Sequence, residues 1–148
     1  YQDFDAAKKA YAPFIEKADI LKFSDDEILA FTGLSDINTA IDKVYRKDML
    51  LLLTMGAKGS KYVYNDLSGF IPSDPVKPVD TTGAGDAFFA GTVIGQTYGK
   101  TMMESCEIGT RLAASVITTG ENVCPRYLPS EFGLDVSAPD DAQLALEL

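Results

Sequence analysis

The stretch from Asp80 to Gly91, DTTGAGDAFFAG, limits what this chain can fold into more than any other. This stretch follows strand-like residues that are interrupted by Pro75 and Pro78, and it leads directly into an apolar series. We therefore expect a helix to begin within the stretch. Gly83 and Gly85 have no Cβ, which lets backbone N–H groups approach an anion closely. The unpaired N–H groups and the positive end of the helix dipole point the same way. This predicts an anion site whose usual occupant is phosphate.

Asp86 stands in the first turn of this expected helix, where its carboxylate would repel a bound phosphate. A general base that takes the proton from an attacking hydroxyl would give that charge a function. The alternative is that Asp86 only caps the helix, since Asp is favoured in a first turn. The stretch is not a dinucleotide-binding fingerprint, because Phe88 stands where the third glycine belongs. It also lacks the Gly-Lys-Ser/Thr of a Walker A loop.

Composition excludes several classes of function. The chain has 148 residues, which is enough for one domain. Its net charge is -9, so we expect no basic surface that could bind nucleic acid. It has no His, and its two cysteines are Cys106 and Cys124, which excludes a thiolate–imidazole metal site and a His-based triad. No apolar run approaches the ~20 residues that cross a bilayer, so no membrane partner is expected. We expect reduced, packed thiols in a cytoplasmic protein, and a chain that begins inside a longer one because it lacks an initiator Met.

The rest of the chain alternates helical and strand patterns, which predicts a single α/β domain with a mainly parallel sheet. The most apolar run, residues 49–54, favours a central parallel strand. The helix that starts at Gly83 is apolar almost all round and should be buried, and residues 138–148 should be partly disordered. The expected helices cover residues 5–17, 25–32, 35–47, 83–98 and 101–119, and the expected strands cover residues 18–23, 49–54, 61–65 and 70–71.

DTTGAGDAF, residues 80–88, resembles the C-terminal signature of the ribokinase-like (PfkB-type) sugar kinases, with fructokinase the most similar branch. The resemblance spans roughly residues 1–128 and leaves 129–148 as an irregular tail. It implies the C-terminal, nucleotide-binding half of a ribokinase-like α/β fold, with a Rossmann-like, mainly parallel sheet flanked by helices. ATP and Mg²⁺, and a monovalent cation such as K⁺, are the implied cofactors.

The resemblance also implies roles for individual residues. Asp86 would be the general base for a primary hydroxyl of the sugar. The transferred γ-phosphoryl would be stabilised by the amides of Gly83, Ala84 and Gly85. A monovalent-cation site would use Asp80, the Thr82 carbonyl and Gly120.

Two further stretches match the family's nucleotide side. Ser24 to Glu27 follows the first expected strand; Glu27 would help to hold the water shell of magnesium, and Ser24 replaces the usual Asn, as in fructokinases. A plain capping box is the alternative for this pair. Residues 54–60, TMGAKGS, follow the most apolar strand, and their counterpart contacts the nucleotide phosphates. The matching residues are Thr54, Gly56, Ala57 and Gly59, and a simple Gly-x-x-Gly hairpin is the alternative.

The match weakens toward the end of the chain. Gly109 stands where many relatives carry an Asn that faces the adenine, and Cys124 replaces a small polar residue. The sugar-contacting acid and the β-sheet lid of the family are expected before this segment, and a homodimer would form through that lid. We therefore expect these 148 residues to bind nucleotide weakly and to lack sugar kinase activity alone.

The expected activity of the intact protein is ATP-dependent phosphorylation of fructose to fructose 6-phosphate. Two alternatives remain open from the sequence. The first is another ribokinase-like enzyme, such as a 2-keto-3-deoxygluconate kinase. The second is a non-catalytic nucleotide-binding module.

Overall fold

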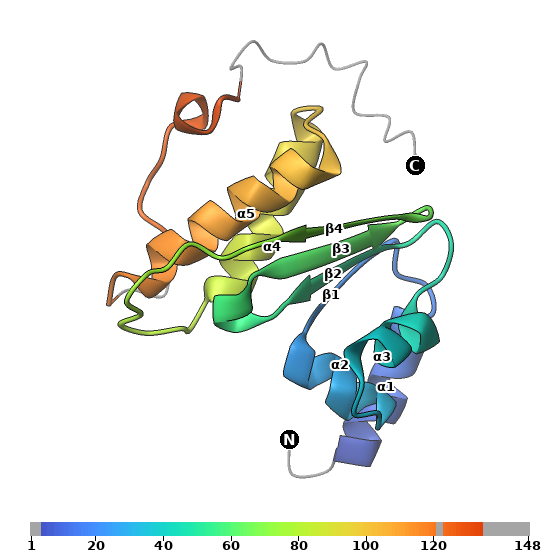
Figure 1. The fold of residues 1–148 in the computed structure, drawn as a ribbon. Coiled ribbons are helices and arrows are strands. Elements are labelled where there is room, and N and C mark those ends of the chain that lie inside the picture. Colours follow the sequence, from blue (N-terminus) through green and yellow to red (C-terminus); the bar gives the residue numbers. More distant parts are fainter. Residues whose placement is uncertain (1–3, 121–122, 135–148) are drawn as a thin grey trace. The chain divides into compact units, whose positions relative to one another are not determined.

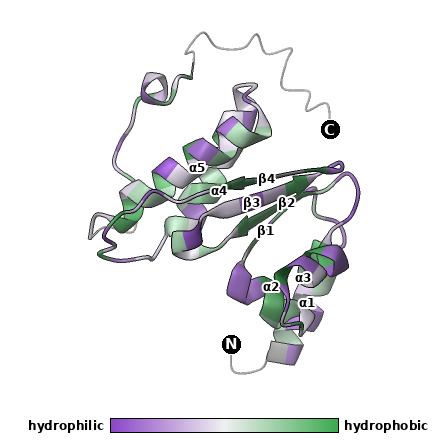
Figure 2. Ribbon diagram, viewed as in Figure 1, coloured by the Kyte–Doolittle hydropathy of each residue, from purple (hydrophilic) through white to green (hydrophobic). Residues whose placement is uncertain are grey.

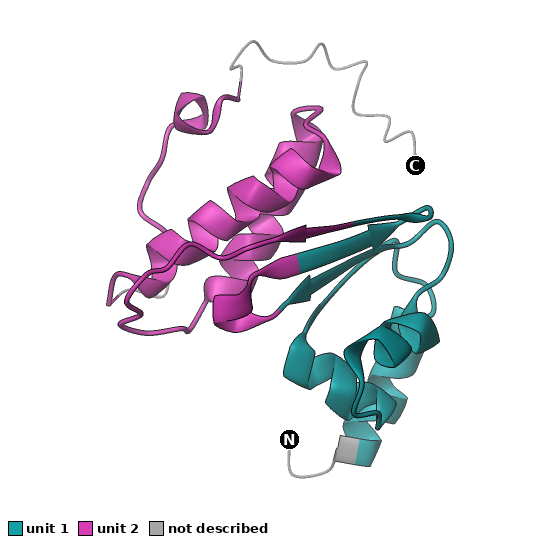
Figure 3. Ribbon diagram, viewed as in Figure 1, with its two compact units in different colours: residues 1–54, 61–68 teal, residues 55–60, 69–148 magenta. Residues whose placement is uncertain are grey.

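The computed structural model describes residues 4–120 and 123–134, and its elements are labelled in Figure 1. The chain divides into two compact units, coloured teal and magenta in Figure 3. Unit 1 contains residues 1–54 and 61–68, and unit 2 contains residues 55–60 and 69–148. The expected tail disorder at residues 138–148 lies outside the described residues, and the expected split into 1–128 and 129–148 stays a prediction.

Unit 1 begins with three helices and two strands whose order follows the sequence prediction. Arg46 caps the end of α1, because its Nη1 and Nη2 donate to the carbonyl oxygens of Ile15 and Ala18 at 2.6 and 2.9 Å. The next helix, α2, ends at Gly33, whose φ of 71° is the left-handed conformation that favours glycine. The elements are α1 (Phe4–Ile15), β1 (Ile20–Ser24), α2 (Asp25–Thr32), α3 (Ile37–Val44) and β2 (Leu50–Thr54).

The sheet has four strands in the order β1-β2-β3-β4. Strands β1 and β2 are parallel, with Ile20 opposite Leu50 and Ser24 opposite Thr54. The next two strands, β3 (Ser60–Tyr64) and β4 (Leu67–Ile71), form a hairpin closed by two residues that both have positive φ. A turn of this kind joins antiparallel strands, so the sheet is mixed rather than purely parallel.

Strand β2 is buried along almost its whole length. Leu50, Leu51, Leu52 and Leu53 expose between 0% and 4% of their surface, and β2 is correspondingly green in Figure 2. Side chains of successive strand residues point to opposite faces, so burial of all four requires cover on both faces of the sheet. The prediction of a central parallel strand over this run is confirmed.

Unit 2 is dominated by two long helices, α4 (Ala84–Thr97) and α5 (Met102–Ile117). The expectation that the first is buried all round is wrong. Only four of its residues are buried, Phe88, Gly91, Thr92 and Gly95, whereas Ile94 is 41% exposed. Its buried face is the one that meets α5, where Gly91 lies against Gly109 and Gly95 against Ser105.

Two short 3₁₀ helices complete unit 2, η1 (Gly56–Lys58) and η2 (Pro129–Phe132). The second lies where an irregular tail was expected, and it packs on α5. The Arg111 guanidinium lies 4.5 Å from the centre of the Phe132 ring, and Leu134 is buried in a cluster with Ile108 and Leu112. None of the helices in the described part of the chain is long and apolar enough to cross a membrane.

Candidate functional site

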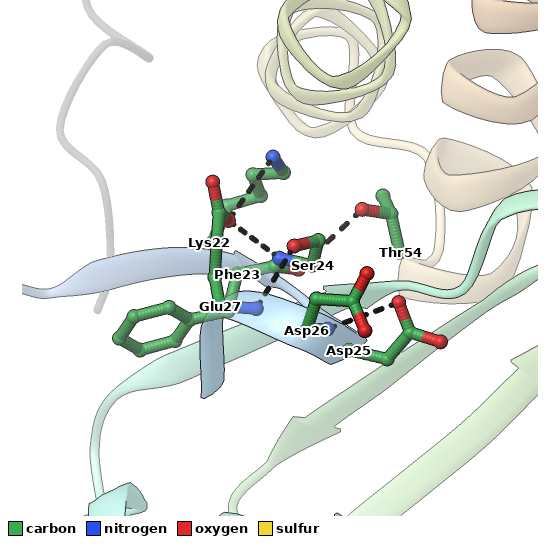
Figure 4. Close-up of polar contacts among 7 residues, drawn as sticks. All are labelled: Lys22, Phe23, Ser24, Asp25, Asp26, Glu27 and Thr54. Atoms are coloured by element: carbon green, nitrogen blue, oxygen red, sulfur yellow. Dashed lines mark hydrogen bonds and ion pairs between the residues drawn. The ribbon is translucent and has the colours of Figure 1, made fainter. Parts of the chain in front are cut away.

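Ser24 and Glu27 lie where β1 passes into α2, and they form a capping box (Figure 4). The Glu27 amide donates to Ser24 Oγ at 3.1 Å, and the Ser24 amide donates to Glu27 Oε2 at 2.7 Å. The carboxylate also lies 3.9 Å from Lys22 Nζ. The capping-box interpretation of this pair is therefore confirmed, and the box leaves the Glu27 side chain 60% exposed. Carboxylate and hydroxyl oxygens are suitable groups for the water shell of Mg²⁺.

Thr54 ends β2 directly opposite Ser24 in the parallel pair. Its hydroxyl donates to the Phe23 carbonyl oxygen at 3.5 Å, as Figure 4 shows. The carboxyl ends of neighbouring parallel strands are where ligands gather on open α/β sheets. Unit 1 thus brings three of the expected site residues together, Ser24, Glu27 and Thr54.

The glycine-rich loop at residues 55–59 belongs to unit 2 and is closed by its own backbone. The Met55 amide donates to the Gly59 carbonyl oxygen at 2.8 Å, and the Gly59 amide donates to the Gly56 carbonyl oxygen at 3.1 Å. Gly59 therefore shapes the loop rather than offering its own N–H. The amides of Gly56 and Ala57 have no hydrogen-bond acceptor among the described residues, and this leaves them as the loop's candidate phosphate donors.

Asp80 forms a tight turn just before α4. Its Oδ1 accepts a hydrogen bond from the Thr82 amide at 2.8 Å. This bond and the Thr82 hydroxyl lower the pKa of the Asp80 carboxyl, so the group is ionised at neutral pH. Its charge suits the expected cation site, which stays a prediction for Asp80 and Thr82.

The N-terminus of α4 lies where the sequence predicts an anion site, and the site itself stays a prediction. Gly83 is the N-cap residue with φ 83°, and it provides no side-chain cap. The Ala84 amide donates to Thr81 O at 3.3 Å, while the amides of Gly83, Gly85 and Asp86 find no acceptor in the residues that the structure describes. Of the three amides expected to bind the phosphoryl group, Gly83 and Gly85 are therefore available and Ala84 is not. Unpaired N–H groups at the positive end of a helix of 14 residues are suited to binding an anion.

Asp86 is exposed in the first turn of α4. Within the described residues its carboxylate accepts no hydrogen bond and pairs with no cation. Asp86 makes no side-chain cap bond there, but its first-turn position still suits the helix dipole, so the cap and general-base interpretations both stay predictions. The carboxylate is free to accept a proton from a hydroxyl brought close to the same N-terminus.

Helix α5 holds this end of unit 2 in place. The amide of Val79, just before Asp80, donates to the Ile117 carbonyl oxygen at 2.7 Å. Gly109 packs against the backbone of α4, where a Cβ would lie 2.6 Å from Thr92 Oγ1. No side chain fits there, so α5 cannot present an Asn-like group to adenine from position 109.

The two cysteines differ in their surroundings. Burial raises the pKa of the Cys106 thiol to about 12, with a smaller opposing effect from its hydrogen bond with Thr92, so it stays protonated. Cys124 is exposed, and the prediction that both thiols are packed is wrong for this residue. Both are free thiols, as expected.

The remaining residues of the expected site also lie in unit 2, which thus carries residues 56–59, residues 80–86 and Gly120. Gly120 is exposed just beyond α5. Two residues beside these segments were missed from the sequence, Ser60 and Thr110, whose hydroxyl oxygens lie 3.5 Å apart. They are 50 positions apart, so no local pattern could have found the pair.

Comparison with known proteins identifies the family. Residues 1–123 match the pfkB family carbohydrate kinases. Fructokinase-1 of Oryza sativa subsp. japonica is 45% identical over 75 residues, which cover 49% of this chain and 23% of that protein. The chain thus spans about a quarter of the length of this curated relative.

Two solved structures share the fold. A probable sugar kinase from Rhizobium etli CFN 42 superposes with a TM-score of 0.77 over 90% of this chain and 43% of its own, at 23% identity. A fructokinase from Vibrio cholerae O395, solved with fructose, ADP and a calcium ion, gives a TM-score of 0.69 over 80% of this chain and 41% of its own, at 27% identity. The fold is ribokinase-like. With its glycine-rich α4 N-terminus, its free Asp86 and the family match over residues 1–123, the chain belongs to the pfkB family of carbohydrate kinases.

Proposed function

We propose that the protein carrying this chain is an ATP-dependent fructokinase that phosphorylates the 6-hydroxyl of fructose. Membership of the carbohydrate kinase family supports the reaction class. The choice of fructose is supported by relatives that are fructokinases, from rice and from Vibrio alginolyticus, the latter 35% identical over 92 residues. The fructokinase from Vibrio cholerae binds fructose and ADP in its crystals, which are the proposed sugar substrate and the proposed nucleotide product for this chain.

One observation carries the mechanism: among the residues described, the Asp86 carboxylate has no partner, and the amides of Gly83, Gly85 and Asp86 at the start of α4 have no acceptor. Asp86 takes the proton of the 6-hydroxyl as the sugar oxygen attacks the γ-phosphorus. The new O–P bond forms while the bond to the β-phosphate oxygen breaks, and ADP leaves. The Gly85 and Asp86 amides donate to the oxygens of the transferred group, where negative charge is held during transfer.

The other segments bind the nucleotide. Amides of Gly56 and Ala57 and the Thr54 hydroxyl hold its phosphates. The Glu27 carboxylate would hold the water shell of a bound Mg²⁺, which would supply positive charge to the phosphate oxygens. Asp80, Thr82 and Gly120 supply oxygen ligands of the kind that a monovalent cation such as K⁺ takes.

Substitution of Asp86 by Asn in the full-length protein tests this mechanism. Asn keeps the shape and removes the proton acceptor, so kcat should fall by about 10²–10⁴-fold while the dissociation constant of ADP changes little. Asp74→Asn is the matched control, since it removes one exposed negative charge outside the site. Steady-state kinetics with fructose and calorimetry with ADP give the two readouts.

Near-normal kcat in a folded Asp86→Asn protein would refute the general-base role, because Asn caps a helix about as well as Asp. A sugar panel decides the substrate. A higher kcat/KM for 2-keto-3-deoxygluconate than for fructose would replace fructose as the substrate and leave the kinase in place. ADP binding without turnover of any sugar would identify a non-catalytic module.

A further inference from the structure

The backbones of α4 and α5 meet without intervening side chains at Gly109. A Cβ built on Gly109 would overlap the Phe88 carbonyl oxygen and would lie 2.6 Å from Thr92 Oγ1. From the other side, a Cβ on Gly91 would lie 2.8 Å from the Gly109 Cα. Real Cβ atoms essentially never come within 3.0 Å of such neighbours, so a side chain at Gly109 would push the two helices apart.

The next residue of α5, Thr110, contacts the other glycine-rich segment of unit 2. Its Oγ1 lies 3.5 Å from the Oγ of Ser60, which is 2% exposed. Thr110 gives its own proton to the Cys106 carbonyl oxygen at 2.9 Å, so Ser60 is the donor in the longer bond. Ser60 directly follows Gly59, the residue that closes the loop. Thr110 therefore fixes the end of the loop that offers the Gly56 and Ala57 amides.

We infer that the Gly109–Thr110 step of α5 is a positioning element that sets the spacing between the two phosphate-binding segments. Consecutive residues of one rigid helix contact both segments, because Gly109 packs against Phe88 and the Thr110 hydroxyl contacts the Ser60 hydroxyl. Phe88 lies two residues beyond Asp86 in the same helix, so a displacement at Phe88 moves the amides and the carboxylate with it. This inference rests on the proposed function for the identity of the ligand.

The two halves of the step should affect different kinetic constants. A shift of α4 displaces the base and the amides that act on the transferred phosphoryl group, and about 1 Å of misplacement can cost about 10²-fold in rate. A loosened loop weakens contacts that are made equally in the ground and transition states, which raises KM for ATP and leaves kcat nearly unchanged.

Gly109→Ala tests the first half, with Gly95→Ala as a matched control in the full-length protein. A Cβ on Gly95 would lie 2.7 Å from Ser105 Cα, so both variants force the same two helices apart. Gly95 lies near the end of α4 that is farther from Asp86. At a similar loss in Tm, we expect kcat to fall at least 10-fold further for Gly109→Ala. Equal losses of kcat in the two variants would overturn the inference for α4.

Thr110→Val tests the second half and remains informative if Gly109→Ala does not fold. Valine keeps the shape and removes the hydroxyl, and we expect KM for ATP and the ADP dissociation constant to rise about 3–10-fold. Thr110→Ser should restore both. Thr97→Val is the matched control, since Thr97 donates to the carbonyl oxygen four residues back at 2.9 Å and lies exposed on α4. ADP affinity equal in Thr110→Val and Thr97→Val would overturn the inference for the loop.

Failure of the proposed function can be distinguished from failure of the positioning inference. A wild-type protein that binds ADP but phosphorylates no sugar would refute the fructokinase proposal. The loop half of the inference would then still be decided by calorimetry, as weaker ADP binding to Thr110→Val than to Thr97→Val. In that case the α4 half would be decided by comparing ADP binding in the two glycine variants.

Discussion

Gly59→Ala should destabilise the protein far more than the same change at Gly56, although the two glycines stand three positions apart in one loop. Gly59 has φ 121° and ψ -149°, a region of backbone conformation that is essentially restricted to glycine, and placing Ala there costs about 1–3 kcal/mol. Its Cβ would also overlap the Ile71 carbonyl oxygen and lie 2.9 Å from Pro72 Cα. These are backbone atoms that cannot rotate away.

Relief of that overlap requires β4 or the loop to move, and overpacking of this kind costs about 1–3 kcal/mol. Together the two effects predict a loss of about 2–6 kcal/mol in the free energy of unfolding. Substitution of Gly56 separates the backbone strain from the steric overlap. It has φ 55°, and a Cβ there would meet nothing within 4 Å, so Gly56→Ala should cost only the left-handed strain of about 1–2 kcal/mol.

Urea unfolding of both variants and of the wild-type full-length protein, followed by circular dichroism, measures the two losses. The difference between Gly59→Ala and Gly56→Ala isolates the overlap with β4. Losses that agree within about 0.5 kcal/mol would refute the reasoning, because they would show that the loop and β4 do not meet at Gly59.

Two other properties can be checked without changing the site. Cys124 should react with a thiol reagent in the native protein, while Cys106, buried with its pKa raised to about 12, should react only after denaturation; mass spectrometry of labelled peptides distinguishes the two. The pKa values of Asp36 and Glu104 are lowered by hydrogen bonds from Thr39 and Thr101, so their stabilisation is complete above the unfolded pKa values and is lost as the pH falls below about 4. Urea unfolding between pH 3 and pH 7 should therefore show a flatter acid limb in Asp36→Asn and Glu104→Gln, with their curves approaching that of the wild type only as the pH falls below about 4.

Local signals were enough to predict most of the elements. Ser24 and Glu27 are three residues apart, which is the spacing of a capping box, and Gly33 ends the helix that they begin. The leucines of β2 form an apolar run too short for a helix, and their burial confirms the strand. These features depend on neighbours in sequence, so the sequence alone is sufficient to find them.

Features that depend on contacts between distant residues could not be predicted. The sequence shows that Gly109 is a glycine in a helix, but only the meeting of α4 and α5 shows why no side chain fits there. The exposure of Ile94 was missed for the same reason, since an apolar residue is buried only where another element covers it. Ser60 and Thr110 are 50 positions apart, and no local pattern connects them.

The acidic composition is compatible with an anion site because the candidate phosphate donors are mostly backbone amides. The chain carries a net charge of -9, and Lys58 is the one cation within residues 54–60 and 80–86. Amides of Gly56, Ala57, Gly85 and Asp86 provide directed partial positive charge without changing the net charge of the protein. Binding through fixed dipoles at short range is screened less by salt than binding through a broad basic surface. Nucleotide affinity should therefore fall only weakly with ionic strength.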